Sequence, residues 1–157
     1  MLETIQYVVK DGVGTLTLNR PQRKNAIDAV MREELRQVIA TMPGQRDLRA
    51  LIITGAGATF CAGGDISVMG AGTLSPEDGR HRMRHDYLSW IETLLRLEIP
   101  VISAVEGPAY GAGFSLALTA DIVLAAPSSR FCLSFMKLGL IPDCAAFYTL
   151  PRVVGLQ

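Results

Sequence analysis

Residues 101–113 read VISAVEGPAYGAG, a short apolar run followed at once by a turn that holds three glycines. The same order occurs upstream, where residues 50–64 read ALIITGAGATFCAGG. A short, continuous apolar run that stops at a glycine is typical of a strand in a parallel sheet, buried on both faces. The two units therefore predict a parallel sheet whose strands end in glycine-rich turns.

Helical and strand patterns alternate along the remaining chain. The predicted elements are strands over 4–9 and 13–18 that form an antiparallel hairpin, a helix capped by Asp28 and ended by Pro43-Gly44, a strand over 50–54, a helix marked by Tyr87 to Leu95, a strand over 101–105, a helix over 111–119 and a strand over 121–125. This alternation predicts a single-domain α/β fold.

Composition excludes several classes of function. The 157 residues include 15 Lys+Arg and 15 Asp+Glu, so the formal net charge is zero and we expect no nucleic-acid partner. No apolar run reaches the roughly 20 residues of a membrane span, and the N-terminus lacks a signal-peptide pattern. The three cysteines are widely spaced, which predicts neither a disulfide framework nor a metal cluster. We expect a soluble, cytoplasmic protein.

Charge is distributed unevenly along the chain. Residues 101–157 contain six charged side chains, namely Glu106, Asp121, Arg130, Lys137, Asp143 and Arg152. So few charges predict that this third is mostly buried, or that something absent from the sequence covers it.

The two glycine-rich turns are candidate binding elements. Glycine lets a ligand approach the backbone, and free N–H groups at the start of a helix favour negative charge, so paired turns can hold one developing oxyanion. The alternative is that the glycines serve close packing and turn geometry alone. Two turns in equivalent places favour the binding site.

Other motifs are weaker. Residues 55–60 lack the third glycine of a dinucleotide-binding fingerprint, and the chain has no phosphate-loop Gly-Lys-Ser/Thr triplet. Residues 113–117 approach a hydrolase nucleophile motif around Ser115, but they lie beyond the strand end, and His81 and His85 precede this serine. These two histidines have no third ligand nearby, so we expect surface residues and no metal site.

Four segments together carry a resemblance to a known family. They are Asn19-Arg20-Pro21 with Asn25-Ala26, Phe60-Cys61-Ala62-Gly63-Gly64-Asp65-Ile66, Gly107-Pro108-Ala109-Tyr110-Gly111-Ala112-Gly113 with Ala120-Asp121, and Leu138-Gly139-Leu140-Ile141-Pro142-Asp143. In order and spacing the chain resembles the enoyl-CoA hydratase/isomerase (crotonase) superfamily. Within it, residues 131–152 are most similar to the phenylacetate-pathway isomerase-like branch.

The resemblance implies a β-β-α spiral fold and an acyl-CoA thioester substrate. Coenzyme A would enter as part of the substrate, with no separate cofactor and no metal, and the assembly would be a homotrimer or a dimer of trimers. Such proteins run about 100 residues further, within the usual size of a domain. Residues 1–157 would then be the acyl-CoA-binding core, the N-terminal two-thirds, without a C-terminal helical region.

The resemblance also implies roles for particular residues. Backbone N–H groups of Gly64 and Ala112 would form the oxyanion hole, and the alanine, which stands where the family usually has glycine, still supplies its N–H. The adenine and pantetheine path would follow Ala62, Gly64, Asp65, Ile66 and Ser67. Arg23 or Lys24 would reach a phosphate of coenzyme A.

Departures from the family pattern reduce the number of reactions that the site can catalyse. Ser115 and Phe135 occupy the positions of the two glutamates that activate water in hydratases, so classical hydration lacks both of its acid–base groups. Asp143 remains, and its apolar neighbours predict a raised pKa that suits proton transfer. The alternative is that Asp143 caps a helix that begins near Cys144. Cys144-Ala145-Ala146 stands where a Gly-Gly pair usually follows the aspartate, and Cys144 is expected to be a packing residue.

The sequence therefore favours an enoyl-CoA isomerase. Asp143 would be its single acid–base residue, and Ser115 would hold a water or a polar substrate group. One alternative is a catalytically weak acyl-CoA-binding relative. The other is hydration through an unmatched carboxylate such as Glu106 or Asp65.

Overall fold

Two antiparallel strands open the main sheet. The computed structural model describes residues 2–68 and 75–157. Strand β1 (Ile5–Lys10) pairs with β2 (Val13–Leu18) around a tight turn. Leu16 and Leu18 are fully buried, whereas alternate residues of β2 are partly exposed. The predicted half-buried hairpin is confirmed.

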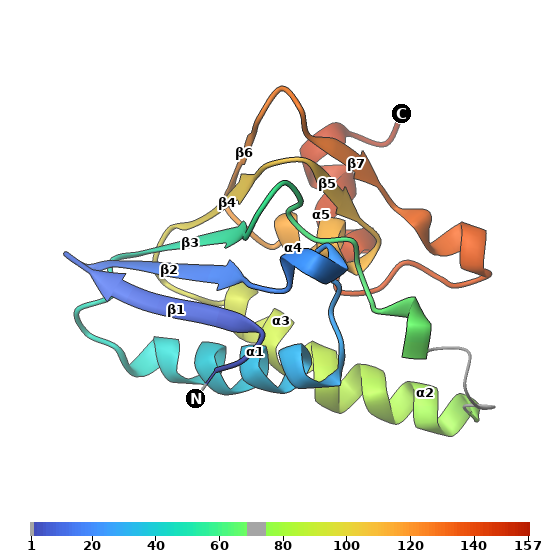
Figure 1. Ribbon diagram of the computed structural model, residues 1–157, viewed down its shortest axis with the longest axis horizontal. Coiled ribbons are helices and arrows are strands. Elements are labelled where there is room, and N and C mark those ends of the chain that lie inside the picture. The colour runs from blue at the N-terminus through green and yellow to red at the C-terminus, as the bar shows by residue number, and fades with distance from the viewer. Residues whose placement is uncertain (1, 69–74) are drawn as a thin grey trace.

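Three further strands extend this sheet in parallel. They are β3 (Ala50–Gly55), β4 (Val101–Val105) and β6 (Ile122–Ala125), and the strand order is β1-β2-β3-β4-β6. Figure 1 shows the sheet with its helices, and the predicted α/β organisation is confirmed. β3 and β4 alternate buried and partly covered residues, so they are less enclosed than their sequence predicts.

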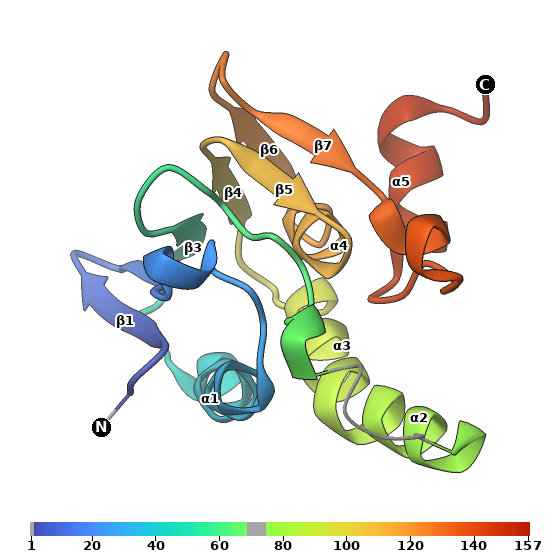
Figure 2. The ribbon, with the colours of Figure 1, turned by 45° about the vertical axis from the view of Figure 1, so that its right-hand side comes forward.

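A second, smaller sheet lies beyond the carboxyl ends of these strands. β5 (Pro108–Tyr110) pairs in parallel with β7 (Arg130–Cys132), side by side in Figure 2. Parallel bridges from Cys61 to Ala109 and from Ile27 to Gly64 continue the same layer. The chain thus passes repeatedly from the main sheet to the second layer and back through a helix, a β-β-α spiral.

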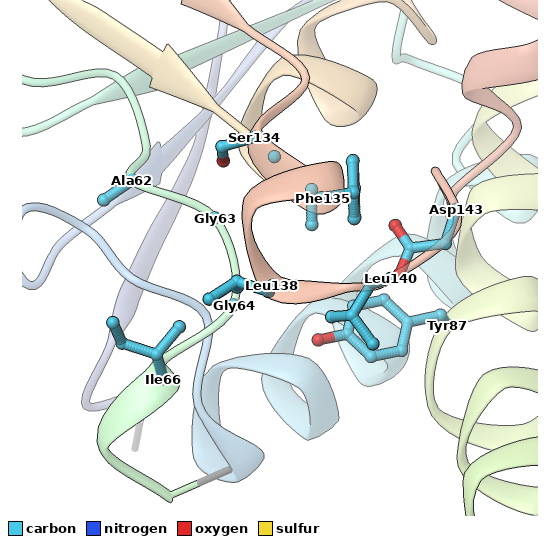
Figure 3. Close-up of a pocket in the computed structure, with 12 residues that line it drawn as sticks. Ala62, Gly63, Gly64, Ile66, Tyr87, Ser134, Phe135, Leu138, Leu140 and Asp143 are labelled. Carbon is cyan, nitrogen blue, oxygen red and sulfur yellow. The ribbon is translucent and has the colours of Figure 1, made fainter. Parts of the chain in front are cut away.

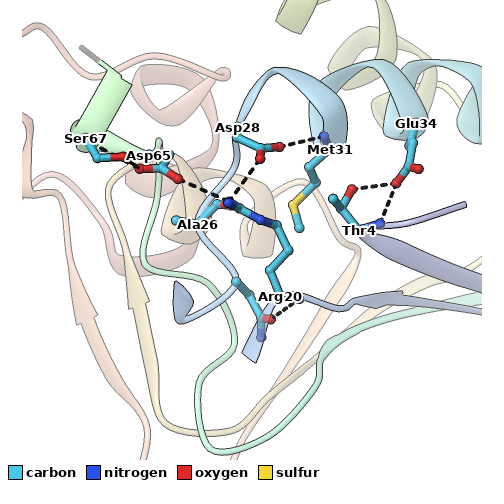
Figure 4. Close-up of polar contacts among 9 residues, drawn as sticks. Thr4, Arg20, Ala26, Asp28, Met31, Glu34, Asp65 and Ser67 are labelled. Carbon is cyan, nitrogen blue, oxygen red and sulfur yellow. Dashed lines mark hydrogen bonds and ion pairs between the residues drawn. The ribbon is translucent and has the colours of Figure 1, made fainter. Parts of the chain in front are cut away.

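Helix α1 (Ala29–Thr41) begins where the sequence predicts. The Asp28 carboxylate accepts a hydrogen bond from the Met31 N–H at 2.8 Å, which caps the helix, and Met31, Leu35 and Ile39 are fully buried. Glu34 of this helix binds the residue just before β1. Its carboxylate accepts hydrogen bonds from the N–H of Thr4 at 2.9 Å and from the Thr4 hydroxyl at 2.5 Å (Figure 4).

The other helical segments complete the fold. In chain order they are η1 (Pro21–Arg23), η2 (Met42–Gly44), η3 (Ile66–Val68), α2 (Pro76–Arg82), the π-helical turn η4 (Met83–Leu88), α3 (Ser89–Leu95), α4 (Ala112–Ala117), η5 (Ser134–Leu138) and α5 (Ala146–Val154). α2, η4 and α3 follow one another without a break, so the predicted helix at 87–95 starts earlier than its apolar pattern suggests.

The two glycine-rich turns pack against each other with no room for side chains. A Cβ at Gly113 would lie 2.4 Å from the carbonyl oxygen of Cys61 and 2.6 Å from its Cβ. A Cβ at Gly63, where φ is +97°, would lie 2.7 Å from the carbonyl oxygen of Tyr110. Glycine at these positions therefore allows successive turns of the spiral to meet.

The expectation of a mostly buried C-terminal third holds only in part beyond α4, where Phe135, Cys144 and Ala146 are buried but many other apolar side chains are exposed. Leu116 and Ala117 are fully buried, but many of the apolar side chains that follow are exposed, and no element among the described residues covers them. This C-terminal apolar surface comprises Ile122, Leu124, Met136, Leu138, Ile141, Phe147, Tyr148, Val153, Val154 and Leu156. A segment with so few charges predicts an apolar surface that another element or subunit covers, and none of the described residues covers this one. Within the described ranges, no helix has the length and apolarity needed to cross a membrane.

We expect Gly113→Ala to lower the free energy of unfolding by about 1–3 kcal/mol, because the added methyl overpacks the contact with Cys61. Gly79→Ala is the matched control, since Gly79 is also helical and nothing lies within 4 Å of an added Cβ. That variant should gain up to about 1 kcal/mol from helix propensity. Urea unfolding measures both, and equal effects of the two substitutions would contradict the packing account.

Candidate active site

Both glycine-rich turns open onto one small cavity of about 70 Å³ (Figure 3). Its walls come from the 62–66 loop, the start of α4, η5, the 140s loop and η4. The lining residues are Ala62, Gly63, Gly64, Ile66, Tyr87, Gly111, Ala112, Ser134, Phe135, Leu138, Leu140 and Asp143. Residues far apart in the sequence thus meet where the spiral brings its turns together.

The N–H groups of Gly64 and Ala112 are available at this cavity. Among the hydrogen bonds of the described residues, neither N–H donates to a protein acceptor. Ala112 is the first residue of α4, and the first N–H groups of a helix have no partner within it. Gly63 brings the two segments close, since its Cβ would lie 3.4 Å from the Ala112 nitrogen. Two such donors can stabilise a developing oxyanion.

Asp143 contributes a largely buried carboxyl to the same cavity. Its Oδ1 is buried without a hydrogen-bond partner, and Asp143 is the only carboxylate among the lining residues. Burial raises the pKa of Asp143, and the neighbouring Cys144 thiol offsets part of that increase. A carboxyl of this kind can take and return a proton near neutral pH.

Asp143 does not cap a helix. α5 begins at Ala146, its N-cap is Ala145, and no side chain caps it. The Asp143 backbone carbonyl accepts from the Ala146 N–H at 3.0 Å, while the carboxyl accepts from no N–H at the start of this helix. The capping alternative is therefore wrong for this chain.

Cys144 and Ala145 adopt left-handed backbone conformations, with φ of 49° and 65°. Glycine is favoured there, because a Cβ crowds the neighbouring backbone. The Cys144 thiol is buried, and this burial together with the nearby Asp143 charge raises its pKa, which fits a packing role.

Ser115 is placed away from the cavity. Its side chain is fully buried, and its hydroxyl donates to the Gly111 carbonyl at 3.3 Å. The structure therefore does not bring Ser115 together with Asp143. Phe135, at the other altered position, does line the cavity and is 6% exposed.

Asp65 is occupied by an ion-pair network (Figure 4). Arg20 contacts the carboxylates of Asp65 at 3.2 Å and Asp28 at 3.0 Å, and the Ser67 hydroxyl donates to Asp65 at 2.6 Å. The bond from Ser67 and the charge of Arg20 hold the pKa of Asp65 below its usual range. Asp65 is thus an ionised anchor of its loop. Glu106 is exposed and outside the cavity lining.

The residues expected along the coenzyme A path lie at one edge of the cavity. Ala62 and Ile66 line it, and the Ala62 N–H donates to the Lys24 carbonyl at 3.0 Å. The side chains of Arg23 and Lys24 are exposed. Their positive charges are therefore accessible beside the glycine-rich loop.

Two residues of this region have roles that the sequence did not predict. Asn25 is fully buried, and its amide donates to the carbonyls of Ala56, Thr59 and Phe60, so it shapes the first glycine-rich turn. The sequence feature that could have indicated its burial is the apolar Ala26-Ile27 pair that follows it. Tyr87 was assigned to a helix core but lines the cavity from η4. No sequence pattern marks that π-helical turn.

Comparison with known proteins adds to this geometry. The family model described as "Enoyl-CoA hydratase/isomerase" matches residues 9–157. The chain belongs to the enoyl-CoA hydratase/isomerase family. It is 43% identical over 156 residues to the 1,2-epoxyphenylacetyl-CoA isomerase of Escherichia coli (strain K12), covering 99% of this chain and 60% of the relative.

Solved structures of the family share the fold. An enoyl-CoA hydratase/isomerase from Cupriavidus metallidurans CH34 has a TM-score of 0.90 and 40% identity, covering 100% of this chain and 58% of that one. A Thermobifida fusca YX protein, a putative enoyl-CoA hydratase solved in complex with acetoacetyl-CoA, has a TM-score of 0.83 and 32% identity. The match covers 98% of this chain and 62% of that one. The expected crotonase fold is confirmed. The chain spans about 60% of the length of the curated relative above.

We expect Asp143→Asn to gain stability relative to wild type as the pH rises. The pKa of Asp143 is raised above 3.8 in the folded protein, so the folded state binds this proton more tightly than the unfolded state does. The proton therefore stabilises the fold fully below the unfolded pKa, and this stabilisation is lost as the pH rises through the folded pKa. Asparagine does not titrate. Thermal unfolding of both proteins from about pH 3 to about pH 8 measures this difference. A difference that is constant with pH would contradict the raised pKa.

We expect Ala145→Gly to raise the free energy of unfolding by about 1 kcal/mol, since it relieves a left-handed alanine. Ala146→Gly is the control, because Ala146 lies in α5 and should lose about 0.5–1 kcal/mol. Denaturant unfolding of both variants gives these values. Destabilisation by Ala145→Gly as large as that of the control would contradict the strain.

Proposed function

We propose that this chain carries the site of an enoyl-CoA isomerase, which shifts a double bond of an acyl-CoA thioester. The observation that carries the proposal is one cavity shared by the Asp143 carboxyl, whose Oδ1 has no hydrogen-bond partner, and the backbone of Gly64 and Ala112. Isomerisation needs one group that moves a proton and one site that holds the negative charge formed on oxygen. The cavity offers one of each.

Asp143 performs both proton transfers in this mechanism. As a carboxylate, it takes a proton from C2 of a 3-enoyl thioester, and the C2–H electron pair delocalises into a dienolate. The same proton returns from the carboxylic acid to C4, which leaves the double bond between C2 and C3. Substrate and product are isomers, so the step consumes no water and no oxidant.

The Gly64 and Ala112 N–H groups hold the thioester oxygen. Its charge grows as the dienolate forms, and donors fixed in advance stabilise that charge without reorganisation. The glycine contacts of Gly63 and Gly113 support this rigidity. In the same proposal, Arg23 or Lys24 binds a phosphate of coenzyme A, and residues 62–67 line the remainder of the thioester's path.

The cofactor and the assembly are part of the proposal. Coenzyme A belongs to the substrate, so the chemistry of Asp143 requires no further cofactor and no metal. A homotrimer or a dimer of trimers is the proposed assembly, supported by the uncovered C-terminal apolar surface.

Hydration has weaker support in this site. It needs a positioned water and, in this family's pattern, two carboxylates, whereas Asp143 is the only one lining the cavity. Asp65 is held by Arg20 and Ser67, and Glu106 is exposed. A family named for both reactions nevertheless makes 2-enoyl-CoA hydration a necessary comparison in any assay.

The test compares Asp143→Asn with wild type on 3-hexenoyl-CoA. We expect the variant to lose about 10²–10⁴-fold in kcat, because the acid–base group is gone, while the Kd for hexanoyl-CoA changes little. Glu106→Gln is the matched control and should keep the wild-type rate.

Full activity of Asp143→Asn would overturn the role of Asp143. Formation of 3-hydroxyacyl-CoA from 2-hexenoyl-CoA, without isomerisation, would replace the isomerase with a hydratase. Tight binding of thioesters without either turnover would instead favour an acyl-CoA-binding relative.

A further inference from the structure

Tyr87 and Asp143 line three cavities of the structure together. Both residues line the small cavity, a larger one of about 500 Å³ that also contacts Arg32 and Arg82, and a third of about 240 Å³. We propose that the Tyr87 hydroxyl is a specificity-determining hydrogen-bond donor to an oxygen atom carried by the acyl group. This inference rests on the proposed function.

The Tyr87 ring is held firmly by its neighbours. The Arg32 guanidinium lies 5.4 Å from the ring centroid, and the Trp90 ring lies 5.9 Å away on the next helical turn. Tyr87 is 5% exposed. A buried ring packed against two such neighbours presents its hydroxyl in one place, which is what a selective contact requires.

The hydroxyl points toward the cavity, away from the helical segment that carries it (Figure 3). Tyr7, another largely covered tyrosine, donates to Gln45 at 2.9 Å, whereas no such bond from Tyr87 occurs among the described residues. Arg32 cannot accept this hydrogen bond, because its guanidinium has only donors. Oδ1 of Asp143 is without a partner, so it does not take this hydrogen. The hydroxyl hydrogen is thus left for a ligand.

Tyr87 acts as a neutral donor and not as a base. Burial raises its pKa to about 12, although the nearby Arg32 charge opposes the shift, so the hydroxyl stays protonated at neutral pH. Arg32 is itself paired with Asp86 at 3.5 Å. A protonated phenol suits an acceptor atom such as a hydroxyl, ether or carbonyl oxygen.

The residues that line the cavity around Tyr87 make its hydroxyl selective for acyl groups that carry an oxygen. Besides the charged Arg32, Arg82 and Asp143, the larger cavity is lined beside Tyr87 by the apolar Met83, Leu140, Ile141 and Pro142. An acyl oxygen placed among them without a partner would lose its hydrogen bonds to water, and Tyr87 restores one. A hydrocarbon acyl group gains nothing from the hydroxyl. The acyl groups favoured are therefore those that carry an oxygen within reach of Tyr87.

The test measures binding, followed by the fluorescence of Trp90, the single tryptophan of the chain. The ligands are hexanoyl-CoA and its 3-, 4-, 5- and 6-hydroxy analogues. In wild type we expect at least one analogue to bind about threefold to tenfold more tightly than hexanoyl-CoA. Tyr87→Phe keeps the ring and its packing, and it should remove this preference while leaving the affinity for hexanoyl-CoA nearly unchanged.

Tyr148→Phe is the matched control. Tyr148 also lies under an arginine, with Arg152 at 3.6 Å from its ring, but it sits on exposed α5 and should keep the preference. A preference that survives Tyr87→Phe, or no preference in wild type, overturns the inference alone. Failure of every thioester to bind overturns the proposed function, and the inference with it.

Discussion

The close contact between the 61–64 loop and the start of α4 is the constraint on which this site depends. Gly113 lies against Cys61, and Gly63 lies against the backbone of Tyr110 and Ala112, at distances that leave no room for a Cβ. In the proposed site, close packing and oxyanion binding, the two alternatives for the glycines, are therefore parts of one arrangement. The packing brings the Gly64 and Ala112 N–H groups to the same cavity, and the second β-layer holds them there.

Unlike the packed glycines, Asp143 sits in a position that lowers the stability of the fold. Its carboxyl is desolvated, its Oδ1 has no hydrogen-bond partner, and the next two residues adopt a backbone conformation that favours glycine. Strain and unpaired polar groups persist where the surrounding structure holds them, and they cluster at functional sites. Asp65 provides the contrast, because its bonds to Arg20 and Ser67 keep it ionised and structural.

Local patterns predicted what depends on local physics. The hairpin, the Asp28 cap and the parallel pairing of the later strands follow from alternation, capping chemistry and short apolar runs. Features set by tertiary packing were not predictable: the inward turn of Ser115, the π-helical turn that carries Tyr87, and the exposure of apolar side chains beyond α4. A charge-poor segment indicates that cover is needed, but not whether this chain supplies it.

The central claim is that Gly64 and Ala112, fixed by the glycine contact, polarise the thioester carbonyl. The most direct measurement is the difference infrared spectrum of butyryl-CoA labelled with ¹³C at its carbonyl, free and bound. The account predicts that the carbonyl stretch moves to lower frequency on binding, and that Gly113→Ala reduces this shift while ligand remains bound. Bound thioester whose carbonyl frequency equals that of the free compound would contradict the account.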